Sequence, residues 1–312
     1  MPCRFMVCWI QLSIPETLPI LFVDPILLLY ASLDVKGNIS PGGPELLPTD
    51  RSGPEGSLSI MEHNISSARL DAAREQLDAA EAQQEAILLR HIANGVVINS
   101  RTVQIEPDVI IAPGAVILAG TILRGKTVIE AGCVIGPNTL IQDSRVEEGT
   151  TVNASQVYGS HLGPHNNIGP FTHVRVNTVT DYGVHLGAYV ETKNSNFARG
   201  NTVSHLTYIG DSDVGKYCNF GCGTVTCNYD GKDKFRTTIG DYCFIGCNTN
   251  LVAPVKVGDG AYTAAGSTIT QDVPAQALGI ARQRQTNLEG WAEPKMEAYI
   301  AKKQKLEADQ NK

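Results

Sequence analysis

Large aliphatic residues recur at a strict interval of six through the middle of the chain. In the first run they are Ile105, Ile111, Ile117, Leu123, Ile129, Ile135 and Ile141. A small or β-branched residue stands four positions after most of them, as Val109 and Ala115 do. An interval of six matches neither the 3.6-residue period of an α-helix nor the two-residue period of a long strand. It is typical of a solenoid of short strands in which one aliphatic side chain per hexad points inward.

The repeat extends to about residue 269. After a shift in phase near Ser144, the aliphatic positions continue at Leu162, Ile168, Val174, Ile239, Ile245, Leu251, Val257 and Ile269. Coils of about 18 residues, stacked about 4.8 Å apart, would pair every strand with the strands above and below it. Glycine and asparagine between the hexads can supply the left-handed backbone angles that the corners need. A β-sandwich would instead show alternating polarity and irregular strand lengths.

Residues 1–60 lack the repeat, and we expect them to form a disordered leader and linker. Residues 33–60 are rich in Gly, Pro and Ser and contain no periodic apolar residues. Pro15 and Pro19 break the apolar beginning of the chain into runs shorter than the roughly 18 residues that a membrane helix needs. No membrane partner is therefore expected. Arg4 followed by Phe5–Ile14 resembles a weak signal peptide, but no small-x-small cleavage site follows, so we favour an unstructured or wrongly assigned leader, with Met61 as the natural start.

Residues 61–95 are expected to form an α-helical linker. The stretch from 66 to 91 lacks Gly and Pro, is rich in Ala, Glu and Gln, and places Leu70 and Leu77 on one stripe. Asn94-Gly95 would end the helix. The remaining predicted domains are a β-helix domain at 96–281 and a C-terminal arm and tail at 282–312.

Charge and cysteine content limit the classes of ligand. A formal net charge of −7 gives no general attraction to nucleic acids or anionic membranes, so no nucleic-acid partner is expected. Five of the eight cysteines cluster within the later repeats: Cys218, Cys222, Cys227, Cys243 and Cys247. No CxxC motif or pair of histidines accompanies them. We interpret them as small apolar residues of a reduced core, and no metal site is expected.

Two segments between the hexads point to a particular family. The hexads themselves resemble those of the hexapeptide-repeat acyltransferases. The segments HLTYIGD at 205–211 and TCNYDGKDK at 226–234 are more specific. They resemble the acetyltransferase half of the bifunctional N-acetylglucosamine-1-phosphate uridyltransferase/glucosamine-1-phosphate acetyltransferase, over about residues 86–292. This resemblance implies an all-β, left-handed parallel β-helix preceded by one α-helix. The spacing alone does not give its handedness, which departs from the usual right-handed crossover.

The resemblance also implies an activity. It is the transfer of an acetyl group from acetyl-CoA to the amine of glucosamine 1-phosphate, for UDP-N-acetylglucosamine synthesis. The family is cytoplasmic and acts as a homotrimer with sites between subunits. No Gly-rich nucleotide-binding loop precedes the expected helix, so a uridyltransferase domain is absent from this chain. A separate uridyltransferase polypeptide would supply that step, or the chain is a fragment.

Acetyl transfer to an amine needs a group that accepts a proton. A histidine is suited to this because its ordinary pKa lies near neutral pH. By resemblance His205 is the catalytic base, and Glu191 is the acid that orients it. His205 is expected on a loop-like break between hexads. The alternative for a single histidine is a purely structural role.

The phosphate of the substrate needs local cations. By resemblance Arg175 and Lys193 bind it, and their separation of 18 residues, one coil, would stack them on the same edge of the prism. The other substrate-binding residues implied are Tyr208, Asn219, Asn228 and Lys234. Lys234 lies on an insertion at 225–236, which can leave the prism and reach a neighbouring subunit.

The residues implied in acetyl-CoA binding follow in later coils. They are Cys222, Cys247, Ala265 and Arg282. The family commonly has Ala and Ser in place of the two cysteines. A thiol in place of a hydroxyl weakens a hydrogen bond, whereas a contact made through the backbone would survive. Val176 stands where Pro commonly follows the phosphate-binding Arg.

Two other functions stay open at this point. One is a hexapeptide acetyltransferase that acts on another amino sugar or a nucleotide sugar. The other is a non-catalytic trimeric scaffold that kept the prism and lost turnover. The presence together of Glu191, Lys193, His205, Tyr208 and Lys234 argues against the scaffold.

Overall fold

The computed structural model describes residues 67–310, so the leader predicted for residues 1–60 lies outside the described residues. The first element is helix α1 (Ser67–Ala93). It ends as predicted, because Gly95 has a φ of +86° and the Asn94 amide donates to the Arg90 carbonyl. Leu70 and Leu77, which mark the predicted apolar stripe, are both exposed.

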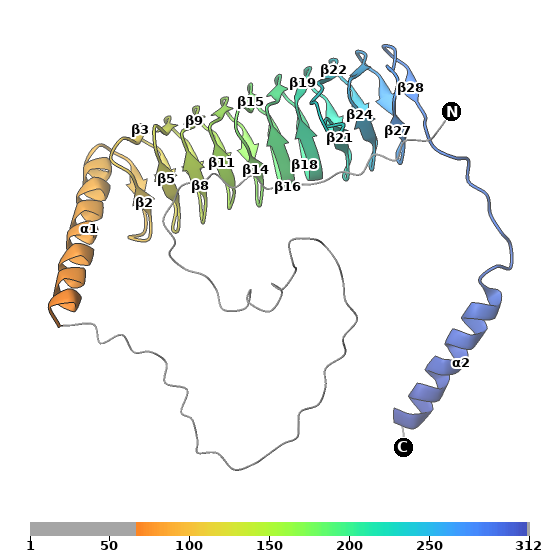
Figure 1. The fold of residues 1–312 in the computed structure, drawn as a ribbon, viewed down its shortest axis with the longest axis horizontal. Helices are drawn as coiled ribbons and strands as arrows, with labels where there is room; N and C mark the ends of the chain where they lie inside the picture. The colour runs from red at the N-terminus through yellow and green to blue at the C-terminus, as the bar shows by residue number, and fades with distance from the viewer. Residues whose placement is uncertain (1–66, 311–312) are drawn as a thin grey trace, which may run out of the picture. The chain divides into compact units, whose positions relative to one another are not determined.

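The hexads form short parallel strands that belong to two sheets. The smaller sheet has nine strands over the described residues: β3 (Ile110–Ile111), β6 (Val128–Ile129), β9 (Arg145–Val146), β12 (His161–Leu162), β15 (Val179–Thr180), β17 (Asn196–Phe197), β19 (Ser212–Val214), β22 (Thr237–Ile239) and β25 (Val255–Val257). Figure 1 shows these strands stacked coil upon coil along the prism.

The larger sheet holds the other strands, two to a coil. They are β1 (Val97–Ile98), β2 (Gln104–Ile105), β4 (Val116–Ile117), β5 (Ile122–Arg124), β7 (Val134–Ile135), β8 (Leu140–Gln142), β10 (Thr151–Val152), β11 (Gln156–Tyr158), β13 (Asn167–Ile168), β14 (His173–Val174), β16 (His185–Lys193), β18 (Thr202–Gly210), β20 (Asn219–Phe220), β21 (Val225–Cys227), β23 (Phe244–Ile245), β24 (Asn250–Val252), β26 (Tyr262–Thr263), β27 (Thr268–Ile269) and β28 (Leu278–Gly279). The predicted fold class, a left-handed parallel β-helix preceded by one helix, is confirmed.

Each hexad places its aliphatic side chain in the core. In the register, Ile117 lies beside Ile135, which lies beside Val152 in the next coil. All three are fully buried. The corners between strands use left-handed backbone angles, as at Asn138 with a φ of +50° and at Gly132 with +70°. The period of six therefore results from one inward side chain and one corner per strand.

Two strands depart from this pattern and position the site. β16 and β18 are nine residues long and pair with each other from His185–Thr202 to Lys193–Gly210. In other coils the corresponding stretch consists of two short strands separated by a corner. In these two coils the strand pairing continues on both sides of that corner.

The cysteine interpretation is correct for some positions and wrong for others. Cys218 and Cys243 are buried in the core. Cys222 and Cys247 are exposed, because they lie at corners, where the side chain points away from the prism axis.

The C-terminal arm contains a helix that the sequence analysis did not predict, α2 (Glu293–Gln310). Its described side chains are all exposed. Among residues 67–310, neither helix combines the length and the apolar character that a membrane span requires.

Replacement of one inward isoleucine should destabilise the prism, and its sequence neighbour provides the control. Ile111 is 3% exposed and Ile110, on the same strand, is 62% exposed. We expect Ile111→Ala to lower the free energy of unfolding by about 2–5 kcal/mol, since it leaves a cavity in the core. Ile110→Ala should cost far less. Denaturant unfolding followed by circular dichroism would measure both, and equal losses would contradict the inward assignment.

Candidate active site

Four of the predicted site residues occupy equivalent corner positions in successive coils. Strand pairs on both sides of the corner have the same offset, since Phe220 pairs with Ile245 and Val225 with Asn250. The equivalent corner residues are His205, Cys222, Cys247 and Ala265, which we call the His205 edge. Strands about 4.8 Å apart place the outer two of these residues about 14 Å apart.

His205 lies in the middle of strand β18, beside Ala188 of β16. The expectation of a loop-like break at this position is therefore wrong. The β16–β18 ladder continues on both sides of the corner, and the backbone turns at Leu206, whose φ is +26°. The His205 side chain is exposed and takes no part in the core. It is free to meet a ligand at the edge.

Arg282 lies near the far end of the same edge. A methyl group placed on Gly266, next to Ala265, would contact the Arg282 Cδ atom at 3.7 Å. The stem of Arg282 thus runs along the coil that carries Ala265. The residues predicted for acetyl-CoA binding follow one another along one edge.

The predicted phosphate-binding residues lie on the next corner of the prism. Val174 pairs with Thr192, so Arg175 and Lys193 are neighbours in successive coils. The Arg175 Nη1 atom donates to the Glu191 Oε1 atom at 2.7 Å. Within residues 67–310, Glu191 makes this ion pair and forms no hydrogen bond or ion pair with His205. The predicted orienting acid is therefore paired with a predicted phosphate ligand in this protomer.

Lys193 lies close to a second lysine. The Lys234 ammonium beside it, followed by burial, lowers the pKa of Lys193. The Arg175 guanidinium acts in the same direction, and the Asp211 carboxylate opposes it. Cations gather against their mutual repulsion where an anion can bind between them. We call Arg175, Lys193 and Lys234 the cation cluster.

Polar residues surround the cation cluster. Tyr208 pairs in register with Glu191, and burial raises the pKa of its hydroxyl, opposed by a hydrogen bond with Asn228. Asn228 in turn donates to the Asp211 carboxylate. A methyl group on Gly210 would overlap the Tyr208 hydroxyl, so a glycine is needed here. The structure brings Tyr208 and Asn228 together with the cation cluster, whereas Asn219 lies on the strand that precedes the His205 edge.

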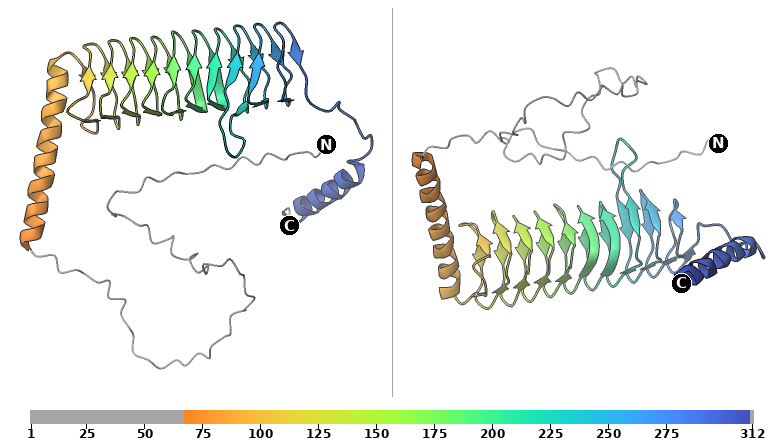
Figure 2. Two further views of the ribbon diagram at one scale, coloured as in Figure 1. Left: turned by 45° about the horizontal axis from the view of Figure 1, so that its top comes forward. Right: turned by 90° about the horizontal axis from the view of Figure 1, so that it is seen from below.

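The insertion that carries Lys234 is a compact hairpin. Tyr229 and Lys234 form an antiparallel bridge, and the Asp230 carboxylate accepts from the backbone amides of Lys232 and Asp233. Arg236 binds both oxygens of the Asp213 carboxylate, at 2.8 and 2.6 Å, and fixes the base of the hairpin. Figure 2 shows the segment between β21 and β22 projecting from the prism.

Sequence reasoning missed Asp211, Asp213 and His173 at this site. Asp211 lies within the HLTYIGD segment, so its motif was the available signal. Asp213 and Arg236 lie 23 residues apart, and only the insertion brings them into one ion pair. His173 pairs in register with Glu191 and packs edge-on against Tyr158 at 5.7 Å. Burial lowers the pKa of His173.

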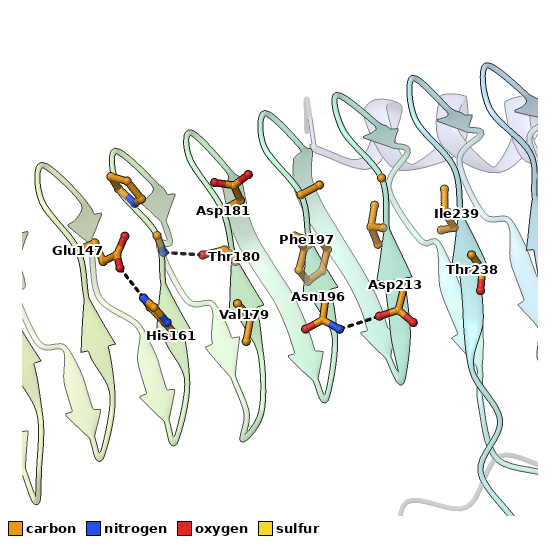
Figure 3. A pocket seen from close by; sticks show the side chains of 15 residues that line it. Glu147, His161, Val179, Thr180, Asp181, Asn196, Phe197, Asp213, Thr238 and Ile239 are labelled. Atoms are coloured by element: carbon orange, nitrogen blue, oxygen red, sulfur yellow. Dashed lines mark hydrogen bonds and ion pairs between the residues drawn. The ribbon is translucent and has the colours of Figure 1, made fainter.

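A separate hollow of about 610 Å³ lies on the smaller sheet (Figure 3). The His161 Nε2 and Glu147 Oε1 atoms bond at 2.7 Å across it, and Asn196 donates to Asp213. None of the predicted site residues lines this hollow. Asp213, which holds the base of the hairpin through Arg236, lines it, whereas no residue of the His205 edge or of the cation cluster does.

Comparisons with known proteins agree with this arrangement. Residues 236–271 match the family model for the bacterial transferase hexapeptide (six repeats). The bifunctional protein GlmU of Thermoanaerobacter pseudethanolicus is 45% identical over 249 residues, which are 79% of this chain and 54% of that protein. GlmU of Caldanaerobacter subterraneus is 50% identical over 225 residues, 72% of this chain and 49% of that protein. This chain is thus similar to the GlmU proteins over its hexapeptide-repeat region. It spans about half the length of these relatives.

The proximity of Lys234 to Lys193 predicts how the pKa of Lys193 responds to substitution, and this can be tested without substrate. We expect Lys234→Gln to raise the pKa of Lys193, since the substitution removes the neighbouring positive charge that lowers it. Lys232→Gln, on the same hairpin but paired with Asp233, is the control and should leave the pKa unchanged. An NMR titration of labelled lysine side chains would measure both. An identical Lys193 titration in the wild-type protein and Lys234→Gln would disprove the cluster.

Proposed function

We propose that this chain transfers an acetyl group from acetyl-CoA to the amine of glucosamine 1-phosphate, giving N-acetylglucosamine 1-phosphate. The observation that carries the proposal is the position of an exposed histidine, His205, on the strand next to the one that bears Lys193 of the cation cluster. An amino sugar phosphate needs both, a base for its amine and cations for its phosphate. The similarity to GlmU over most of the prism supports the same function.

In this proposal His205 accepts the proton of the attacking amine. Its exposed ring at the edge leaves the nitrogen atoms accessible to a substrate. Acetyl-CoA lies along the His205 edge, where backbone groups at Cys222 and Ala265 and the side chains of Cys247 and Arg282 would hold it. The amine attacks the thioester carbonyl, the bond to sulfur breaks, and coenzyme A leaves as the thiol.

The cation cluster holds the phosphate in this proposal. Arg175 now donates to Glu191, and a phosphate that binds Arg175 would compete for that guanidinium. Glu191 is then released toward its proposed role as the orienting acid. Tyr208, Asn219 and Asn228 would bind the sugar hydroxyls.

The assembly in this proposal is a cytoplasmic homotrimer. The prism has flat sheet faces that can pack around a threefold axis. The projecting hairpin can then carry Lys234 toward a site on a neighbouring protomer.

A panel of acceptors tests the proposed reaction. We expect coenzyme A release with glucosamine 1-phosphate to exceed release with glucosamine or with nucleotide sugars. Loss of one charged partner of a phosphate costs about 1.5–3 kcal/mol, so Lys193→Ala should raise the KM for glucosamine 1-phosphate about ten- to a hundredfold. Lys216→Ala, an exposed lysine outside the site, is the control. A higher rate with another acceptor would mean that glucosamine 1-phosphate is not the substrate. No coenzyme A release with any acceptor would favour the non-catalytic scaffold.

Removal of the proposed base tests the mechanism. We expect His205→Ala to fold normally, since its side chain is outside the core, and to lower kcat by about 10²–10⁴-fold. Binding of acetyl-CoA should change little, and the residual rate should rise with pH as more of the acceptor amine loses its proton. His185→Ala, on the neighbouring strand, is the control. Near wild-type turnover of His205→Ala at neutral pH would exclude His205 as the base.

A further inference from the structure

The His205 edge carries two exposed thiols in adjacent coils. Cys222 and Cys247 are both exposed and neither is in a disulfide. The strand pairs before and after the corner share one offset of 25 residues, which places Cys222 and Cys247 at equivalent positions. The Asn248 amide also donates to the Cys222 carbonyl at 2.8 Å. The two cysteines are thus direct neighbours across the coil boundary.

Their separation suits a disulfide. Adjacent strands lie about 4.8 Å apart, within the range of about 4.4–6.8 Å between Cα atoms that disulfides span. Cys247 also packs closely against the glycine next to Cys222. A methyl group placed on Gly221 would lie 2.4 Å from the Cys247 backbone nitrogen, 2.7 Å from its Cα atom and 2.8 Å from its Sγ atom. The glycine at this position therefore allows the two coils to approach closely beside the two cysteines.

The same two coils contain a second cysteine pair with the same offset. Cys218 and Cys243 are also 25 residues apart, but they are 1% and 2% exposed. Their thiols donate to carbonyl oxygens of neighbouring coils, Cys218 to Gly240 at 3.0 Å and Cys243 to Gly258 at 3.1 Å. A soluble oxidant reaches exposed thiols and not buried ones. The buried pair is therefore a built-in control for the exposed pair.

We propose that Cys222 and Cys247 form a reversible disulfide that closes the His205 edge to acyl-CoA. The link to turnover rests on the proposed function, whereas formation of the disulfide does not. The bond would draw both side chains together over the backbone that acetyl-CoA is proposed to contact. In a reducing cytoplasm the pair stays as thiols, and an oxidising shift converts it.

The reaction is thiol–disulfide exchange with a low-molecular-weight disulfide such as oxidised glutathione. The thiolate of one cysteine attacks a sulfur of glutathione disulfide, forms a mixed disulfide and releases one glutathione thiol. The second cysteine attacks the protein sulfur of that mixed disulfide. It forms the Cys222–Cys247 bond and releases the second glutathione, so both cysteines are oxidised and one glutathione disulfide is reduced to two thiols.

The first test is a peptide map of the full chain after treatment with oxidised glutathione. We expect one cross-linked species that joins the peptides of Cys222 and Cys247, lacks two hydrogen atoms, and disappears on treatment with dithiothreitol. Cys218 and Cys243 should remain open to alkylation after unfolding. A stable glutathione adduct without the cross-link, or a cross-link through any other pair, would overturn the proposal.

The second test follows turnover. Oxidised wild-type protein should lose coenzyme A release and recover it with dithiothreitol, while the double variant Cys222→Ser/Cys247→Ser, which has neither thiol at this edge, should keep its own untreated rate after the same oxidation. Loss of turnover in the oxidised double variant would overturn the proposed closure. Because the peptide map requires no activity, failure of the acetyltransferase proposal would leave the disulfide result intact.

Discussion

The parallel register between successive coils is the constraint on which the rest of the structure depends. Each coil buries its aliphatic side chains against those of the coils above and below, as Ile117, Ile135 and Val152 do. A shift of one residue would turn these side chains outward, at a cost of about 1.5–3 kcal/mol for each one exposed. The same register aligns every outward residue with its counterpart in the next coil. Functional side chains far apart in sequence therefore form columns, such as the His205 edge and the neighbours Arg175 and Lys193.

How much of this could be predicted depends on whether a feature repeats. The interval of six gave the solenoid and its core, and the interval of 18 between Arg175 and Lys193 gave their stacking. The continuous corner at His205 could not be predicted, because strands β16 and β18 replace the usual break with a ladder that only the paired backbones define. The exposure of Cys222 and Cys247 was missed for a related reason. Small residues serve both inside the core and at corners, so residue type did not distinguish Cys222 from Cys218.

The sequence also did not predict which side chains pair between adjacent coils, or the contacts that the insertion makes. Glu191 and Arg175 are 16 residues apart and bond because one lies on each of two adjacent coils. Family resemblance assigned them separate partners, His205 and a phosphate. In the protomer the two opposite charges pair with each other instead, which avoids an unpaired guanidinium and an unpaired carboxylate at one corner.

The Arg175–Glu191 ion pair also determines the charge of the site. Arg175 is neutralised by Glu191, so the charge that remains uncompensated belongs mainly to Lys193 and Lys234, with Asp211 nearby as a partial counterion. A phosphate monoester carries a charge of about −1.5 to −2 near neutral pH. Two lysines held close together match that charge without help from the guanidinium. In the proposed function, Arg175 changes partner from Glu191 to phosphate without leaving the cluster short of positive charge, and phosphate binding releases Glu191. The Arg175–Glu191 ion pair is thus compatible with the proposed role of Glu191, because the anion that the lysines would attract is also the group that would separate the pair.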